Sequence, residues 1–244
     1  MSEPSTQPES ETTPSSANPV DAMMEEASAD LARGAYLDAA LRCRQALGEA
    51  RYQQDFGRMK RICLPMLESQ RAVRLSALDT GTIHQISSSG DISPEPDASC
   101  YLFAPNFVGA DTRRFRAAAN DAGIGVFVLT REPTTSKGRW PIVGVGDRVV
   151  RVQVEPPADD KPTATWFAHA SETLGDQAIK DALAASSPDD PKQWIVDDFL
   201  DRIDACPEHE KFIKALADAC HNAINAPATT RRRRRGTVND PYSF

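Results

Sequence analysis

The stretch CYLFAPNFVGADTRRFRAAANDAGIGVFVLT, residues 100–130, decides the fold. Two short apolar runs, at residues 100–104 and 125–130, flank a segment from Asp111 to about Asp121 that has helical spacing. Parallel strands need a connection of about a dozen residues, and a helix supplies it. The sequence therefore predicts a βαβ unit with two parallel strands near the middle of the chain.

Further strands are indicated on both sides of this unit. Residues 82–86 alternate like a half-buried strand, and a loop rich in Ser, Pro and Asp follows them. Residues 140–145 and 148–155 flank Gly146 and Asp147, which is typical of a β-hairpin. We expect residues 80–157 to form one small α/β module with four or five strands and one helix.

The segment before this module has the 3.6-residue period of helices. Met24, Ala27 and Leu31 share one helical face, and Gly34 separates them from a second helix. A third helix runs into Pro65, which either kinks it or starts a fourth. Residues 21–78 are therefore expected to form a helical region.

Part of this region is similar to a known repeat. Gly34, Tyr36, Ala39 and the pair Ala46 and Leu47 match the turn and second helix of a tetratricopeptide repeat. The resemblance covers one unit, about residues 22–50. It implies a packed helical hairpin with a surface for binding peptides.

Three helices are expected after the module, within residues 163–226. The first spans about residues 165–185. Asp190, Pro191 and Gln193 have the types preferred at the N-cap, N1 and N3 positions of a second helix, which a Cys-Pro pair at 206–207 ends. Phe212, Leu216 and other apolar residues mark the third.

The fold class predicted is therefore α/β or α+β, with a small sheet between two helical regions. The expected organisation is a disordered tail over residues 1–20, a tetratricopeptide-like helical region over 21–78, the α/β module over 80–157, a helical region over 163–226 and a disordered basic tail over 227–244.

The charge is divided unevenly. The net charge is −7, and it would be −12 without the five consecutive arginines Arg231, Arg232, Arg233, Arg234 and Arg235. Three interpretations of this run stay open: a phosphate-binding arm for nucleic acid, a solubilising tail, and a segment that folds back on Asp197, Asp201 and Asp204. With Asp198, those carboxylates also have the spacing of a solvated helix face.

An anion site is the most specific chemical prediction. Ligands bind at the carboxyl edge of parallel strands in open α/β sheets, and basic residues gather beside that edge in the sequence. A phosphate or carboxylate would be held there by arginines, with a tryptophan for stacking. The candidate residues are Arg113, Arg114, Arg116, Lys137, Arg139 and Trp140.

No catalytic, cofactor or metal site is predicted. The five cysteines are scattered and lack a CxxC pair, which argues against a disulfide framework or a zinc ribbon. Cys206, His209, Cys220 and His221 lie close in sequence, but adjacent residues on a helix point about 100° apart. The serines lack a nucleophile-elbow pattern, so the sequence favours a non-enzymatic protein.

The function expected is that of a cytoplasmic adaptor or scaffold that binds another protein. Tyr36 in the helical hairpin and Tyr242 and Phe244 in the C-terminal tail are the candidate contacts. Binding of nucleic acid through the arginine run is one alternative, and a small-anion or nucleotide sensor at the sheet edge is another. No membrane partner is expected, and a homodimer is compatible with the pattern.

Overall fold

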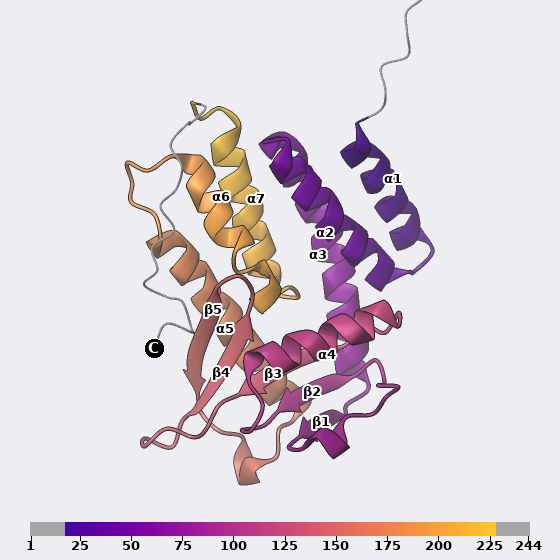
Figure 1. The fold of residues 1–244 in the computed structure, drawn as a ribbon, viewed down its shortest axis with the longest axis vertical. Coiled ribbons are helices and arrows are strands. Elements are labelled where there is room, and N and C mark those ends of the chain that lie inside the picture. The colour runs from indigo at the N-terminus through magenta and orange to yellow at the C-terminus, as the bar shows by residue number, and fades with distance from the viewer. Residues whose placement is uncertain (1–17, 228–244) are drawn as a thin grey trace, which may run out of the picture.

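The computed structural model describes residues 18–227 (Figure 1), and it confirms a mixed α/β fold. The N-terminal helices are α1 (Pro19–Ala32), α2 (Tyr36–Tyr52) and α3 (Phe56–Asp79). The central module contains β1 (Ile83–Ile86), β2 (Cys100–Phe103), α4 (Gly109–Asp121), β3 (Phe127–Arg131), β4 (Trp140–Val145) and β5 (Val149–Val154). The C-terminal helices are α5 (Ala164–Ala184), α6 (Lys192–Leu200) and α7 (Glu210–Ile224). Short 3-10 turns lie at η1 (Ser89–Asp91), η2 (Ala158–Asp160) and η3 (Ile203–Ala205).

The five strands form one sheet in the order β1-β2-β3-β4-β5. Strands β2 and β3 are parallel and joined through α4, which confirms the βαβ unit. Strand β1 also pairs with β2 in parallel, although the connection between them carries only the η1 turn. Strands β4 and β5 form the expected antiparallel hairpin, with Trp140 opposite Val154.

Both faces of the sheet are covered. Alternate residues of β2 and β3, including Tyr101, Phe103 and Val128, pack in a cluster with Phe115 of α4. The residues between them, such as Leu102, face the opposite way and join the main core, in which the Phe127 ring meets Phe167 of α5. The sheet is therefore a layer between α4, in front of it in Figure 1, and α5 behind it.

The two helical regions pack on each other. Helices α3 and α7 lie in contact in the upper part of the molecule (Figure 1), and α2 packs along α3. One continuous hydrophobic cluster contains Met59 of α3, Leu102 of β2, Phe167 of α5 and Phe212 of α7. The predicted segments thus share one core.

Three local predictions are wrong. Helix α6 ends at Leu200, where the chain turns into η3, and not at the Cys206–Pro207 pair. No fourth helix starts at Pro65, since α3 continues without interruption to Asp79. Its buried face, which includes Met66 and Val73 beyond the proline, is held against the core. Helix α6 begins at Lys192 with Pro191 as its N-cap, because the Asp190 carboxylate accepts a hydrogen bond from the Ser187 N–H of the preceding turn.

Residues 1–17 and 228–244 of the predicted tails, with the arginine run and the two C-terminal aromatic contacts, lie outside the described residues. The end of the predicted N-terminal tail is wrong, because α1 begins at Pro19 and Val20 is fully buried in the core. Within residues 18–227, none of the helices has the length and apolar character that a membrane crossing requires.

Candidate functional site

Two adjoining cavities lie between the N-terminal helices and the α/β module. Their volumes are about 240 and 180 Å³, and Leu37 of α2 and Val73 of α3 line both. We call this feature the α2–α4 groove. One end is lined by residues of the α1–α2 turn, the start of α2, α3 and the connection between α4 and β3, including Tyr36. The other end is lined by α2, α3, α4, η3 and the segment after η3, including Arg44, Arg113, Arg116, Asp204 and Glu208.

The first end of the groove depends on glycines. Gly34 closes the α1–α2 turn with a positive φ of 78°, which is disfavoured for other residues. A Cβ on Gly125 would lie 3.0 Å from Val73 Cγ1, so the chain entering β3 approaches α3 more closely than a side chain allows comfortably. Tyr36 is 44% exposed at this end. Its ring is therefore available to a ligand.

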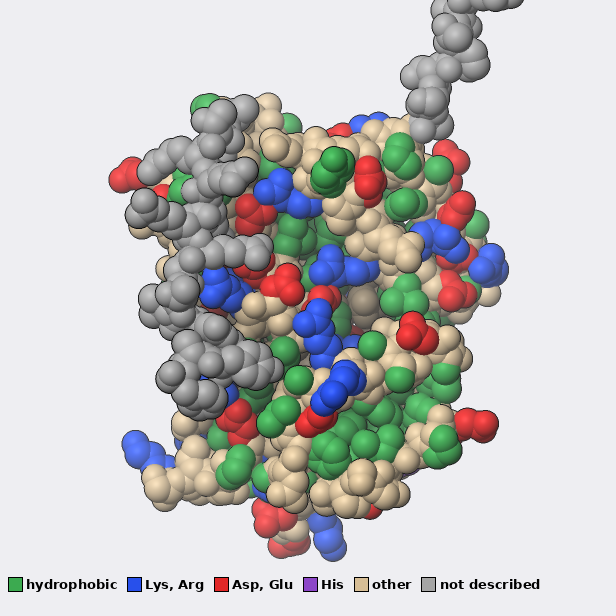
Figure 2. Space-filling model, in the orientation of Figure 1, with side chains coloured by type: hydrophobic (Ala, Val, Ile, Leu, Met, Phe, Trp, Pro, Cys, Tyr) green, Lys and Arg blue, Asp and Glu red, His purple; other side chains and the backbone are tan. Residues whose placement is uncertain are grey.

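The second end gathers three arginines around one aspartate. Arg44 Nε lies 3.1 Å from Asp204 Oδ1, and its Nη2 donates to Oδ2 at 3.4 Å. Arg113 Nη2 is 3.9 Å from the same Oδ2, and Arg116 donates to the Asp204 carbonyl oxygen. On the face of the molecule drawn in Figure 2, Lys and Arg side chains gather down the middle.

Arg116 fills a gap in the sheet. Strand β3 pairs with β4 only near its end, where Thr130 lies opposite Val143 and Arg131 opposite Ile142. Earlier in β3, the Val128 carbonyl oxygen accepts from Arg116 Nη2 at 3.3 Å instead. The same guanidinium lies 3.3 Å from the Glu208 carboxylate.

Glu208 is an acid in an apolar setting. It is 4% exposed, and burial raises the pKa of its carboxyl, against the opposing effect of Arg116. Arg116 Nε is itself buried without a hydrogen-bond partner in the described structure. The base of the arginine end thus combines a poorly solvated acid with a guanidinium that is not fully satisfied.

The six predicted anion-site residues do not meet at one place. Only Arg113 and Arg116 line the groove. Arg114 points away and pairs with Asp111, and Lys137 is exposed in the β3–β4 connection.

The other two predicted residues belong to the hairpin. Arg139 pairs with Glu155. Trp140 is buried under the guanidinium of Arg131, whose central carbon is 4.0 Å from the ring centroid. The sequence pattern did not single out Arg44, because it comes from a different region of the chain and only the fold brings it to α4.

The aspartates after residue 196 do not form a solvated face, which makes that interpretation wrong. Asp198 is 3% exposed and accepts from the Ser186 hydroxyl, and Asp201 is 7% exposed with Arg148 3.7 Å away. Asp197 holds Arg51 of α2 in a two-point contact, at 2.6 and 3.0 Å. Asp197 and Asp201 thus join α2 and the β4–β5 turn to the C-terminal helices.

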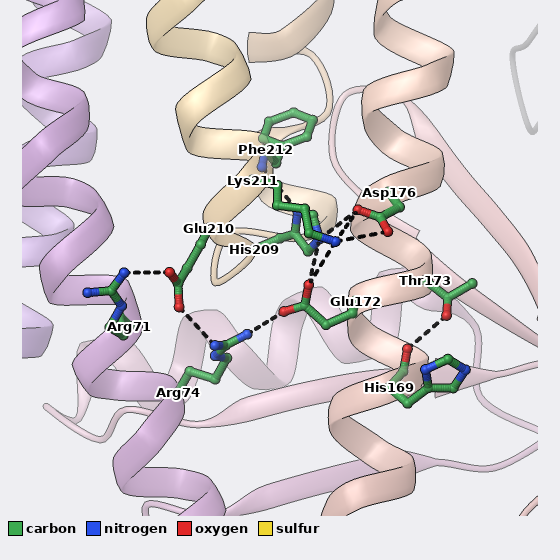
Figure 3. A network of polar contacts seen from close by, with 10 residues as sticks. All are labelled: Arg71, Arg74, His169, Glu172, Thr173, Asp176, His209, Glu210, Lys211 and Phe212. Atoms are coloured by element: carbon green, nitrogen blue, oxygen red, sulfur yellow. Dashed lines mark hydrogen bonds and ion pairs between the residues drawn. The ribbon is translucent and has the colours of Figure 1, made fainter.

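A second polar cluster lies between α3, α5 and α7 (Figure 3). His209 Nε2 lies 3.2 Å from Glu172 Oε2 and 3.4 Å from Asp176 Oδ1, and His209 is 1% exposed. Lys211 Nζ is 3.0 Å from Asp176. Arg74 then joins Glu172 to Glu210 at the other side of the cluster. We call these residues, with Arg71, the α3–α5–α7 network.

Part of this network has the composition of a metal site. Ligand atoms of Glu172, Asp176 and His209 all lie within 4.8 Å of one another, the one such group among the described residues. The backbone N–H of Phe212 donates to His209 Nδ1 at 3.1 Å, which assigns the proton of the neutral ring to Nε2. A protonated Nε2 has no lone pair for a metal, and the two carboxylates already have cationic partners, Arg74 for Glu172 and Lys211 for Asp176. The network is therefore structural.

The cysteines do not supply nucleophiles. All five are free and buried. Burial raises the pKa of Cys43, Cys100 and Cys220 to about 12, so their thiols stay protonated near neutral pH.

Known proteins give no further guide to the site. Comparison with protein-family models, with curated proteins and with solved structures finds no match to this chain. The tetratricopeptide resemblance thus stays a prediction, although the helices that it implies are present.

Proposed function

We propose that the protein is a non-enzymatic interaction module that binds a segment of another protein in the α2–α4 groove. The observation that carries this proposal is the groove itself, with an exposed aromatic ring at one end and three arginines at the other. Apolar side chains of Leu37 and Val73 connect the two ends.

The shape of the groove favours an extended ligand. Its two cavities lie side by side and each is smaller than the roughly 300–1,000 Å³ of a typical small-molecule pocket. Aromatic and arginine side chains are also the groups that most often dominate binding energy at protein interfaces. Both kinds are present here, separated by an apolar stretch that would contact the segment between them.

Photo-crosslinking tests the proposal directly. A benzophenone amino acid replaces Tyr36 in the full chain, which is irradiated in a native lysate, and the adducts are identified by mass spectrometry. Tyr52 provides the matched control, because it lies at the other end of the same helix, is 85% exposed and does not line the groove. We expect a defined protein adduct from position 36 and not from position 52.

A second variant tests whether the groove surface is responsible. Leu37→Asp places a charge between the two cavities, and we expect it to abolish the adduct from position 36 while circular dichroism shows an unchanged helix content. Equal adducts from both tyrosine positions, or no adduct from position 36, would overturn the proposal.

A further inference from the structure

The arginine end of the groove already contains one carboxylate, and that carboxylate is accessible. Asp204 accepts from both Nε and Nη2 of Arg44, in the two-point geometry that guanidinium groups make with carboxylates. Its side chain is 37% exposed and that of Arg113 is 51% exposed. Water therefore reaches the place where the two guanidinium groups converge.

Positive charge at this end exceeds negative charge. Among the lining residues, Arg44, Arg113 and Arg116 face two acids, Asp204 and Glu208. Burial raises the pKa of Glu208 and thereby disfavours its charged form. At least one guanidinium charge is left without a full counter-charge, so the end can accept another anionic group.

The remainder of the protein has the opposite sign. The whole chain carries −7, even with five arginines in its C-terminal tail. A locally positive pocket on an acidic body concentrates the field on one place and repels acidic ligands elsewhere. Charge complementarity therefore favours an acidic group as the occupant of this end.

We propose that the arginine end binds an acidic side chain of an extended partner peptide, and that Asp204 is an internal competitor which this side chain displaces. The proposal rests on the proposed function, since it names the chemistry of the segment that the groove would hold. An apolar side chain of the same peptide would contact Leu37 and Val73 beside the arginines. The segment recognised would thus have an acidic residue next to an apolar one.

Displacement of Asp204 is energetically feasible. Ion pairs with this degree of exposure contribute little to stability, because water screens them and the long side chains lose entropy on pairing. The Arg116 guanidinium stays in place during the exchange, since it is anchored on the Val128 and Asp204 carbonyl oxygens. Arg44 and Arg113 exchange the Asp204 carboxylate for the incoming one.

A peptide array tests the proposal. Seven-residue peptides with a fixed central leucine and all residues varied at each other position are probed with the labelled full chain. We expect an enrichment of Asp and Glu at one position near the leucine. Arg113→Gln should reduce binding of the acidic peptides about fivefold or more, whereas Asp204→Asn should increase it about fivefold by removing the competitor.

Arg114→Gln is the matched control, because Arg114 is the next residue on the same helix but does not line the groove. It should leave the acidic preference unchanged. The proposal would be overturned by the absence of an acidic preference, by equal effects of Arg113→Gln and Arg114→Gln, or by the absence of a gain from Asp204→Asn. Inorganic phosphate at about 1 mM that competes as effectively as an unlabelled acidic peptide would instead indicate a small-anion site and would also overturn it.

Failure here is separable from failure of the proposed function. An array that selects apolar residues without acidic ones, together with an adduct from position 36, would retain the interaction module and remove the acidic partner. The absence of both signals would remove both.

Discussion

The α3–α5–α7 network and the arginine end of the groove are built from the same residue types but differ in charge balance. In the network, Arg71, Arg74 and Lys211 meet Glu172, Asp176 and Glu210, and Glu68 adds a further carboxylate to Arg71. In the groove, three arginines meet two acids, one of which is buried.

This difference separates a structural cluster from a binding surface. Every cation of the network has a carboxylate partner within 3.1 Å, and the network joins three helices that also share the main core. The arginine end joins α2 to η3 through Arg44, at 3.1 and 3.4 Å from Asp204, and α4 to η3 through a longer contact of 3.9 Å from Arg113. Substitutions in the network should therefore affect folding, and those in the groove should affect binding.

The largest expected effect lies beneath His209. Gly175 of α5 packs against the imidazole, and a Cβ at this position would lie 2.1 Å from its Cγ. Gly175→Ala should therefore lower the free energy of unfolding by about 3 kcal/mol, at the upper end of the cost of overpacking a core. Urea unfolding followed by circular dichroism measures the change.

Gly48→Ala is the control for this prediction. Gly48 lies in α2, and a Cβ added there would have nothing within 4 Å, so the substitution should raise stability by about 0.5–1 kcal/mol through helix propensity alone. A gain in stability from both alanines would show that α5 moves away from His209 at little cost, and that the network is looser than the distances indicate.

The next effect concerns Arg74, which is 15% exposed and donates to both Glu172 and Glu210. Arg74→Gln leaves these carboxylates partly unpaired, and we expect the free energy of unfolding to fall by about 1–2 kcal/mol. The cost is smaller than at a fully buried ion pair, because water reaches both acids. Chemical unfolding at low and moderate salt measures it. A change below about 0.3 kcal/mol would contradict the structural role of the network.

The sequence predicted the helices and the βαβ unit because their signals are local. The two apolar runs and the helical spacing between them identify two strands and a crossover helix within residues 100–130, without reference to other segments. Of the two expectations for Pro65, the start of a fourth helix is wrong, because α3 packs against the core on both sides of the proline. Asp190 has the right type for a helix cap but caps a turn instead.

The candidate site was only partly predictable, because it is assembled from distant segments. Arg113 and Arg116 stood out as cations near the start of a helix, but Arg44 comes from α2, about 70 residues earlier, and Glu208 from the segment after η3. The aspartates showed a helical period that is equally typical of a solvated face. Only the position of their arginine partners, such as Arg51 and Arg148, shows that they are engaged.

A smaller effect should appear as a dependence of stability on pH. Burial lowers the pKa of His209 below its ordinary value near 6.5, against the opposing effects of Glu172 and Asp176. The imidazole of His209 therefore binds a proton more readily in the unfolded chain than in the folded one. The stability contributed by the neutral ring is full above about pH 6.5 and is lost as the pH falls below that value.

His209 is the N-cap of α7, where its side chain accepts from the Phe212 N–H. His209→Asn tests the pH dependence, because asparagine is also a good N-cap residue but does not titrate. The difference in unfolding free energy between pH 7 and pH 5 should be about 1 kcal/mol smaller in the variant than in the original chain, with one pKa unit worth about 1.4 kcal/mol. Equal pH dependence in the two proteins would mean that the carboxylates stabilise the imidazolium enough to cancel the cost of burial.

The smallest expected effect is at the groove. Arg113 is half exposed and 3.9 Å from Asp204, so Arg113→Gln should change the free energy of unfolding by less than about 0.5 kcal/mol, as should Arg114→Gln beside it. Arg74→Gln makes the same substitution in the α3–α5–α7 network. The difference between the two losses of stability therefore reports the surroundings of each arginine. If Arg113→Gln destabilised the protein as strongly as Arg74→Gln, the three arginines would serve to hold α4 against α2 and η3. Their positive charge would then have a structural role. A neutral result would show that Arg113 contributes little to the fold, and the reduced peptide binding of the same variant would then be a direct effect on the groove.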